Sequence, residues 1–297
     1  MSQPQNSQEQ PQKNEAGEDK FKFQIIYLLP ILASILFGLG YSLVLLPQST
    51  PVLPMTPIPQ DTPGADWVIA LYFVILLSGS ATLFYFLLKH KRKRPITVLI
   101  TLGLTAAAML PSLVFFVALA SYIPFLDNWI VVIFLSIAVT VLFVLSIFRL
   151  GNKARNTAVI FIGGALGIFF GYNIAGISLW SAVLILVFLS VYDVFAVYKG
   201  PVGKIAQSSG LEQLQGLSFS FKDIQMGLGD LVFYSMLTGT MIFGFPQSFL
   251  PVTASIVGIV VGSVITFYML EKKSIFPGLP FPILLGLAFG LTVGFLM

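Results

Sequence analysis

Long stretches of apolar residues constrain this chain more than any other feature. A helix that crosses a bilayer needs roughly 20 such residues. Only 9% of the residues are charged, whereas a soluble domain carries about 25%. We therefore expect an all-α polytopic membrane protein. Its nine transmembrane helices are expected at residues 24–46, 67–88, 95–120, 129–148, 157–177, 179–198, 228–245, 250–270 and 279–297.

The chain is expected to consist of an N-terminal tail followed by one domain. Residues 1–23 are rich in Gln, Glu, Pro and Lys without an apolar period, which predicts a disordered cytoplasmic tail. Residues 24–297 form the nine-helix domain. Within it, residues 199–227 are the cytoplasmic connector between the sixth and seventh spans.

The basic residues predict the orientation of these spans. All 16 Lys and Arg lie in the tail and in the even-numbered connectors. Cytoplasmic segments carry an excess of Lys and Arg, so we expect the N-terminus in the cytoplasm and the C-terminus outside the cell membrane. An odd number of spans fits this arrangement. The net charge of +4 thus indicates membrane topology and not a nucleic-acid partner.

The composition excludes several chemistries. The chain has no cysteine, which excludes disulfides, thiol catalysis and cysteine-ligated metal. Its single histidine, His90, lies in the basic connector "KHKRKR" and is interpreted as a solvated loop residue. We expect neither a metal nor an organic cofactor.

Two acidic residues lie within the expected spans, whereas the others lie in the tail or the connectors. Asp193 precedes the inner end of the sixth span, and Asp230 lies in the first turn of the seventh. At 1.5 Å per residue, both lie within roughly 10 Å of the inner boundary, where carboxylates on consecutive antiparallel helices can meet. An ionised carboxylate in hydrocarbon is costly and usually faces a cavity and a partner.

Paired carboxylates supply an acid and a base to one site. Two such groups a few ångström apart cannot both ionise, so one deprotonates water while the other polarises a carbonyl. The alternative is that each acid is a separate helix-end carboxylate near the lipid headgroups.

The neighbours of the two acids are open to two interpretations. Gly227 and Gly229, which flank Leu228, let a substrate approach Asp230 closely, or they form a small-residue helix contact. Tyr192 either supports Asp193 or anchors the helix at the membrane interface.

These residues resemble the presenilin and signal peptide peptidase family of GxGD intramembrane aspartyl proteases, and the presenilin branch in particular. The family carries Y-D, G-x-G-D and P-x-L-P in its sixth span, in its seventh span and before its ninth. The corresponding segments are "YD" at Tyr192–Asp193, "GLGD" at Gly227–Asp230 and "PGLP" at Pro277–Pro280.

The resemblance implies roles for these residues. Asp193 and Asp230 would be the catalytic pair, and Pro277, Leu279 and Pro280 would shape the site. Gln225 stands where the presenilin pattern has a lysine. We expect the chain to act without an obligatory accessory subunit.

Segment 217–224, "LSFSFKDI", is a candidate for binding substrate. Leu217, Phe219 and Phe221 alternate with polar residues, a period-two pattern typical of a half-buried strand. Such a strand would pair with an extended substrate. The alternative is an interfacial segment whose phenylalanines enter the lipid.

The sequence therefore predicts an intramembrane aspartyl endopeptidase whose partners are the transmembrane helices of substrate proteins and the lipid bilayer. An ion- or proton-coupled transporter that uses the paired acids is the main alternative. A non-enzymatic membrane scaffold and a prepilin-type peptidase are further alternatives.

Overall fold

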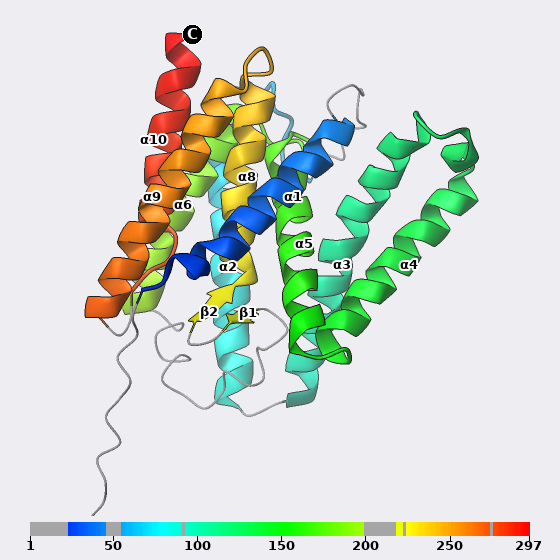
Figure 1. Ribbon diagram of the computed structural model, residues 1–297, viewed down its shortest axis with the longest axis horizontal. Coiled ribbons are helices and arrows are strands. Elements are labelled where there is room, and N and C mark those ends of the chain that lie inside the picture. The colour runs from blue at the N-terminus through cyan, green and yellow to red at the C-terminus, as the bar shows by residue number, and fades with distance from the viewer. Residues whose placement is uncertain (1–22, 46–54, 91–92, 199–217, 222–223, 274–275) are drawn as a thin grey trace, which may run out of the picture.

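The computed structural model describes residues 23–45, 55–90, 93–198, 218–221, 224–273 and 276–297. These residues are mostly helical, with one short two-stranded sheet (Figure 1). In chain order the elements are η1 (Ile25–Leu28), α1 (Leu29–Leu45), α2 (Ala65–Lys89), α3 (Lys93–Ala120), η2 (Pro124–Asp127), α4 (Trp129–Phe148), α5 (Asn152–Gly171), α6 (Leu179–Tyr198), β1 (Ser218–Phe221), β2 (Ile224–Gly227), α8 (Leu228–Gly244), α9 (Leu250–Lys272) and α10 (Pro280–Leu296).

The helices have the apolar character of membrane spans. Within the described residues, 7 helical segments are long and apolar enough to cross a bilayer. Two further apolar helices, α8 and α10, are shorter, with 17 residues each. The expectation of a helical membrane fold is confirmed, whereas the expectation of an all-α chain misses the small sheet.

The tail predicted at residues 1–23 lies outside the described residues except at its last position. Phe23 is described, and its ring stacks on Phe267 of α9 with 5.8 Å between the ring centroids. Its backbone N–H donates a hydrogen bond to the Glu271 carboxylate. Most of the connector 199–227 also lies outside the described residues.

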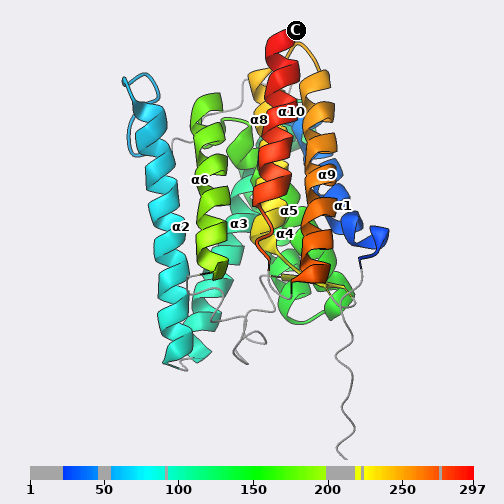
Figure 2. The ribbon, with the colours of Figure 1, turned by 90° about the vertical axis from the view of Figure 1, so that its left-hand side faces the viewer.

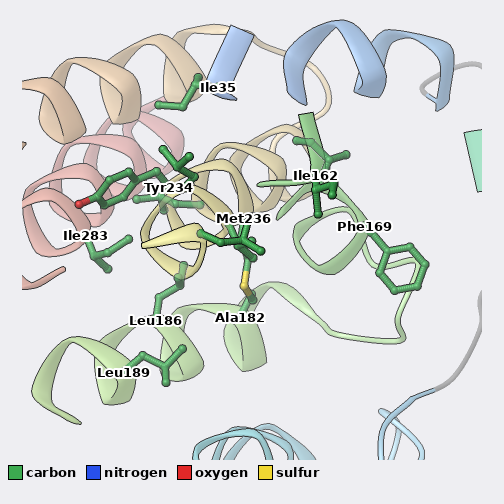
Figure 3. Packing of buried hydrophobic residues seen from close by; sticks show 14 of the residues in the cluster. Ile35, Ile162, Phe169, Ala182, Leu186, Leu189, Tyr234, Met236 and Ile283 are labelled. Carbon is green, nitrogen blue, oxygen red and sulfur yellow. The ribbon is translucent and has the colours of Figure 1, made fainter. Parts of the chain in front are cut away.

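The hydrophobic core is built around α8. Figure 3 shows side chains of α8 packed among side chains of α1, α5, α6 and α10. The labelled core residues are Ile35, Ile162, Phe169, Ala182, Leu186, Leu189, Tyr234, Met236 and Ile283. A central helix with neighbours on several sides has little freedom to move, so α8 holds the residues of its first turn in a defined place.

Glycines bring the backbones of neighbouring helices into contact. A methyl group on Gly167 of α5 would lie 2.5 Å from the carbonyl oxygen of Val232 in α8. In the same way, a methyl group on Gly262 of α9 would lie 2.5 Å from the carbonyl oxygen of Phe281 in α10. Small residues at helix contacts are the usual device for tight packing in membranes.

Helix α2 lies at the edge of the bundle beside α6 (Figure 2). The two helices are joined by a polar cluster at their N-terminal ends. The hydroxyls of Ser178 and Ser181 both donate to one carboxylate oxygen of Asp66, at 2.5 and 2.6 Å. Asp66, expected in a connector, thus lies in the first turn of α2 and links it to α6.

The fifth span differs from its expected position at 157–177. Helix α5 begins at Asn152, directly after Gly151, whose φ of 86° no helix adopts. It ends at Gly171, and Asn173 and Gly176 follow with φ values of 59° and 74°. A residue with positive φ does not fit a right-handed helix. These positions therefore set both ends of α5. The polar residues expected in the connector therefore form the first turns of α5.

Candidate active site

Asp193 lies near the C-terminal end of α6, with its side chain partly buried. One of its carboxylate oxygens, Oδ2, accepts a hydrogen bond from the backbone N–H of Leu279 at 3.0 Å. These two residues are 86 positions apart in the sequence. The carboxylate therefore connects the C-terminal end of α6 to the segment that precedes α10.

Asp230 lies in the first turn of α8, directly after the strand β2. The N-terminus of a helix presents unpaired N–H groups and a positive dipole, which favours a carboxylate there. A methyl group on Gly278 would lie 3.3 Å from the Oδ2 atom and 3.6 Å from the Oδ1 atom of Asp230. The carboxylate thus faces the backbone of Gly278.

The "PGLP" segment brings the two carboxylates to one place. Asp230 contacts Gly278, and Asp193 binds the N–H of Leu279, the next residue. Pro277 and the side chain of Leu279 are buried, and Pro280 begins α10. A proline has no N–H to leave unpaired in the first turn of a helix, which suits this start of α10. The segment therefore lies against both acids.

Tyr234 belongs to the site although we did not single it out in the sequence. It follows Asp230 by four residues on α8, so both side chains lie on the same face of the helix. It is buried, and its hydroxyl donates to the carbonyl oxygen of Gly278 at 3.1 Å. The spacing of one helical turn from an acidic residue is the signal that identifies such a neighbour.

Gly227, Leu228 and Gly229 line an apolar cavity of about 500 Å³. Its other walls come from α2, α5, α6 and the following turns of α8. A methyl group on Gly229 would meet only the ring of Phe233, at 3.7 Å, so the glycine leaves open space. This cavity lies beside the first turn of α8, which carries Asp230.

The strand predicted at 217–224 is shorter than expected and forms half of a hairpin. β1 pairs antiparallel with β2, so that Phe219 lies opposite Met226 and Phe221 opposite Ile224. Both Phe219 and Met226 are buried in the core. Leu217 lies outside the described residues. The alternation thus reflects burial against the protein, and the partner of β1 is the segment that leads into α8.

The remaining predicted residue, Tyr192, precedes Asp193 on α6 and is partly buried. Among the described residues, no group of three or more His, Cys, Asp or Glu side chains is placed to hold a metal ion.

Two solved structures have the same fold. Each is the structure of a presenilin family intramembrane aspartate protease, one in space group C222 and one in P2. The first is 19% identical, with a TM-score of 0.59, and the match covers 90% of this chain and 99% of that chain. The second is 21% identical, with a TM-score of 0.59, and the match covers 93% and 99%.

No protein-family model and no curated protein matches the chain. At these identities the likeness to the two structures establishes the fold. The chain is an integral membrane protein with a presenilin-type fold, as the resemblance in its motifs implied.

Proposed function

We propose that the protein is an intramembrane aspartyl endopeptidase that uses Asp193 and Asp230 as its catalytic pair. The observation that carries this proposal is the convergence of both carboxylates on Gly278–Leu279. The fold shared with presenilin-family proteases and the apolar cavity beside Asp230 support it.

In the proposed reaction, the ionised carboxylate takes a proton from a water molecule while the water oxygen bonds to the carbonyl carbon of the scissile peptide. The protonated carboxyl donates to the carbonyl oxygen and stabilises the tetrahedral intermediate. The C–N bond then breaks as the nitrogen takes up a proton. The products are one carboxyl and one amino terminus, so water is the only co-reactant.

The substrates in this proposal are transmembrane helices of other proteins. A helix satisfies its own backbone hydrogen bonds, so a segment must unwind before its peptide bond can react. The cavity lined by Gly227 and Gly229 would receive the apolar side chains of that segment. A strand of the β1–β2 hairpin would pair with the exposed backbone groups of that segment.

We further propose nine spans in the cell membrane, with the N-terminus in the cytoplasm. At 17 residues, α8 and α10 reach the lower limit of spanning length. The described Lys and Arg residues lie at the ends of α2, α3, α4, α5 and α9 that share one end of the bundle (Figure 1). This end would be cytoplasmic, and the candidate active site lies near it. No accessory subunit is required by this proposal.

The test is cleavage of a single-span substrate by the purified protein in liposomes, with the fragments identified by mass spectrometry. Asp193→Ala, Asp230→Ala and the double variant should lose cleavage to about the same floor, because the two acids act as a unit. Each variant should keep the wild-type circular dichroism spectrum. Proteolysis by either single variant at more than a few per cent of the wild-type rate would contradict the proposal.

A further inference from the structure

One peptide group, the bond between Gly278 and Leu279, is held by side chains of two different helices. Its carbonyl oxygen accepts a hydrogen bond from the hydroxyl of Tyr234 in α8 at 3.1 Å. Its N–H donates to the carboxylate of Asp193 in α6 at 3.0 Å. This peptide is trans, so its C=O and N–H groups lie in one plane and point in opposite directions. The Tyr234 hydroxyl and the Asp193 carboxylate therefore hold the same plane from its two sides.

The sequence around this peptide leaves its carbonyl without the usual partner. In a continuing helix, the carbonyl oxygen of Gly278 would accept from the N–H four residues later. That residue is Pro282, in the first turn of α10, and proline has no N–H to donate. A carbonyl left unpaired inside an apolar bundle is costly. The hydroxyl of Tyr234 supplies the hydrogen bond that the start of α10 lacks.

Tyr234 is placed to hold the peptide in one orientation. It lies in the second turn of α8, the helix that is surrounded by the core, and only 3% of its surface is exposed. Figure 3 shows its ring extending from α8 toward α10. A buried phenol requires a hydrogen-bond partner, and the Gly278 carbonyl is that partner. The position of the hydroxyl is therefore fixed by the packing of the ring.

We propose that Tyr234 is a positioning residue for Asp193, and that it acts through the Gly278–Leu279 peptide. Its hydroxyl fixes the peptide plane so that the Leu279 N–H points at the Asp193 carboxylate. The hydrogen bond to the carbonyl also polarises the peptide and strengthens its N–H as a donor. The inference rests on the proposed protease function, since the placement of Asp193 affects a rate only if Asp193 is catalytic.

The first experiment compares two tyrosines that make the same kind of bond. Tyr234→Phe keeps the ring and removes the hydroxyl. Tyr41→Phe is the matched control, because Tyr41 is 4% exposed and its hydroxyl donates to the carbonyl oxygen of Pro111 at 2.8 Å. That bond joins α1 to α3, and neither helix carries one of the two acids. Both variants lose one buried bond between a tyrosine and a carbonyl, so we expect similar decreases in Tm.

Only the change at position 234 should affect catalysis. Turnover of a single-span substrate is measured in liposomes, and active sites are counted with a tight-binding aspartyl-protease inhibitor, which gives kcat per folded site. We expect Tyr234→Phe to lower kcat about threefold to tenfold, the size of one lost hydrogen bond. KM should stay unchanged, because Tyr234 does not line the apolar cavity proposed to receive the substrate. Tyr41→Phe should keep the wild-type kcat. Equal kcat values for the two variants would overturn the positioning role.

The second experiment measures the coupling without a substrate. Asp193→Ala is combined with Tyr234→Phe and, as a control, with Tyr41→Phe, and Tm is measured for each single and double variant. Residues that share a partner show non-additive effects, whereas distant residues show additive ones. The decreases in Tm should therefore fail to add for Asp193 and Tyr234 and should add for Asp193 and Tyr41. Additive decreases for the first pair would contradict a link through the shared peptide.

The two experiments separate this inference from the proposed function. If the wild-type protein cleaves no substrate, the protease proposal fails, and the Tm measurements alone decide whether Tyr234 and Asp193 are coupled. If the wild-type protein cleaves and Tyr234→Phe has the kcat of the control, the positioning role fails while the protease function stands.

Discussion

At the scale of single residues, Gly278 is the point on which the site depends. It lies against the carboxylate of Asp230, accepts the hydrogen bond of Tyr234, and precedes the residue that binds Asp193. A side chain here would occupy the space next to the Asp230 oxygens. We therefore expect the glycine of "PGLP" to be as necessary for the geometry of the site as the two prolines that the sequence analysis singled out.

Gly278→Ala should impair cleavage while leaving the fold intact. The added methyl group would lie 3.3 Å from the Asp230 Oδ2 atom, so the carboxylate or the segment must shift. Misplacement of a catalytic group by a fraction of an ångström to 1 Å costs on the order of tenfold to a hundredfold in rate. Turnover of a single-span substrate measures the effect.

Gly103→Ala is the matched control for this change. A methyl group on Gly103 of α3 meets nothing within 4 Å, so this variant should turn over substrate at the wild-type rate. Equal rates for the Gly278→Ala variant and this control would show that the contact with Asp230 does not matter for catalysis.

At the scale of elements, the β1–β2 hairpin determines how the chain enters α8. β2 ends at Gly227, and α8 begins at the next residue, so the hairpin fixes the position of the turn that carries Asp230. Phe219 of β1 anchors the hairpin in the core with an exposed fraction of 6%. We propose that the same hairpin pairs with substrate.

Phe219→Pro should impair cleavage severely, whereas Phe219→Ile should retain most of it. Proline cannot donate to a strand ladder, and isoleucine favours strands and remains apolar. Substrate turnover is measured after confirming that each variant still binds an aspartyl-protease inhibitor. A proline variant that binds the inhibitor and also cleaves normally would exclude a role for the hairpin in recognition.

The contact between α2 and α6 should depend on Asp66. Asp66→Ala removes the carboxylate that accepts from both Ser178 and Ser181 and should lower the free energy of unfolding by about 1–3 kcal/mol. Asp61→Ala, at an exposed position, should lower it by less than about 0.5 kcal/mol. Thermal unfolding in detergent, followed by circular dichroism, compares the two. Equal losses would show that the cluster does not stabilise the helix pair.

At the scale of the whole molecule, the bundle has a closely packed centre and a peripheral helix, α2, with few buried residues. α8 is surrounded by other helices, and α9 and α10 approach through glycines. α2 stands at the side of α6 (Figure 2), and few of its residues are buried. The apolar cavity lies between this peripheral helix and the central one, and under the proposed function a substrate helix would enter there from the lipid.

The proposed orientation is tested with single cysteines in this cysteine-free chain. His90 and Met297 are both exposed and lie at opposite ends of the bundle. In intact cells, a membrane-impermeant thiol reagent should label the Met297→Cys variant and not the His90→Cys variant. Permeabilised cells should show labelling of both. Labelling of the His90→Cys variant from outside would reverse the orientation.

The sequence by itself determined the membrane class, the approximate position of each helix and the candidate acids. These properties follow from apolar runs and isolated charges, which are local and do not depend on the partners of a helix. The expected boundaries failed at α5, because glycine and asparagine in left-handed conformations set its ends and hydropathy does not register them.

Only the tertiary structure decided which groups meet. Asp193 lies 86 residues from Leu279, and nothing in either segment specifies their hydrogen bond. The hydrogen bond of the Tyr234 hydroxyl to the Gly278 carbonyl joins two residues that are 44 positions apart. The partner of β1 was likewise decided by the fold, since an alternating strand shows one apolar face but not what covers it. Contacts of this kind depend on the close packing of glycine-lined helices, which is a property of pairs of elements and not of single segments.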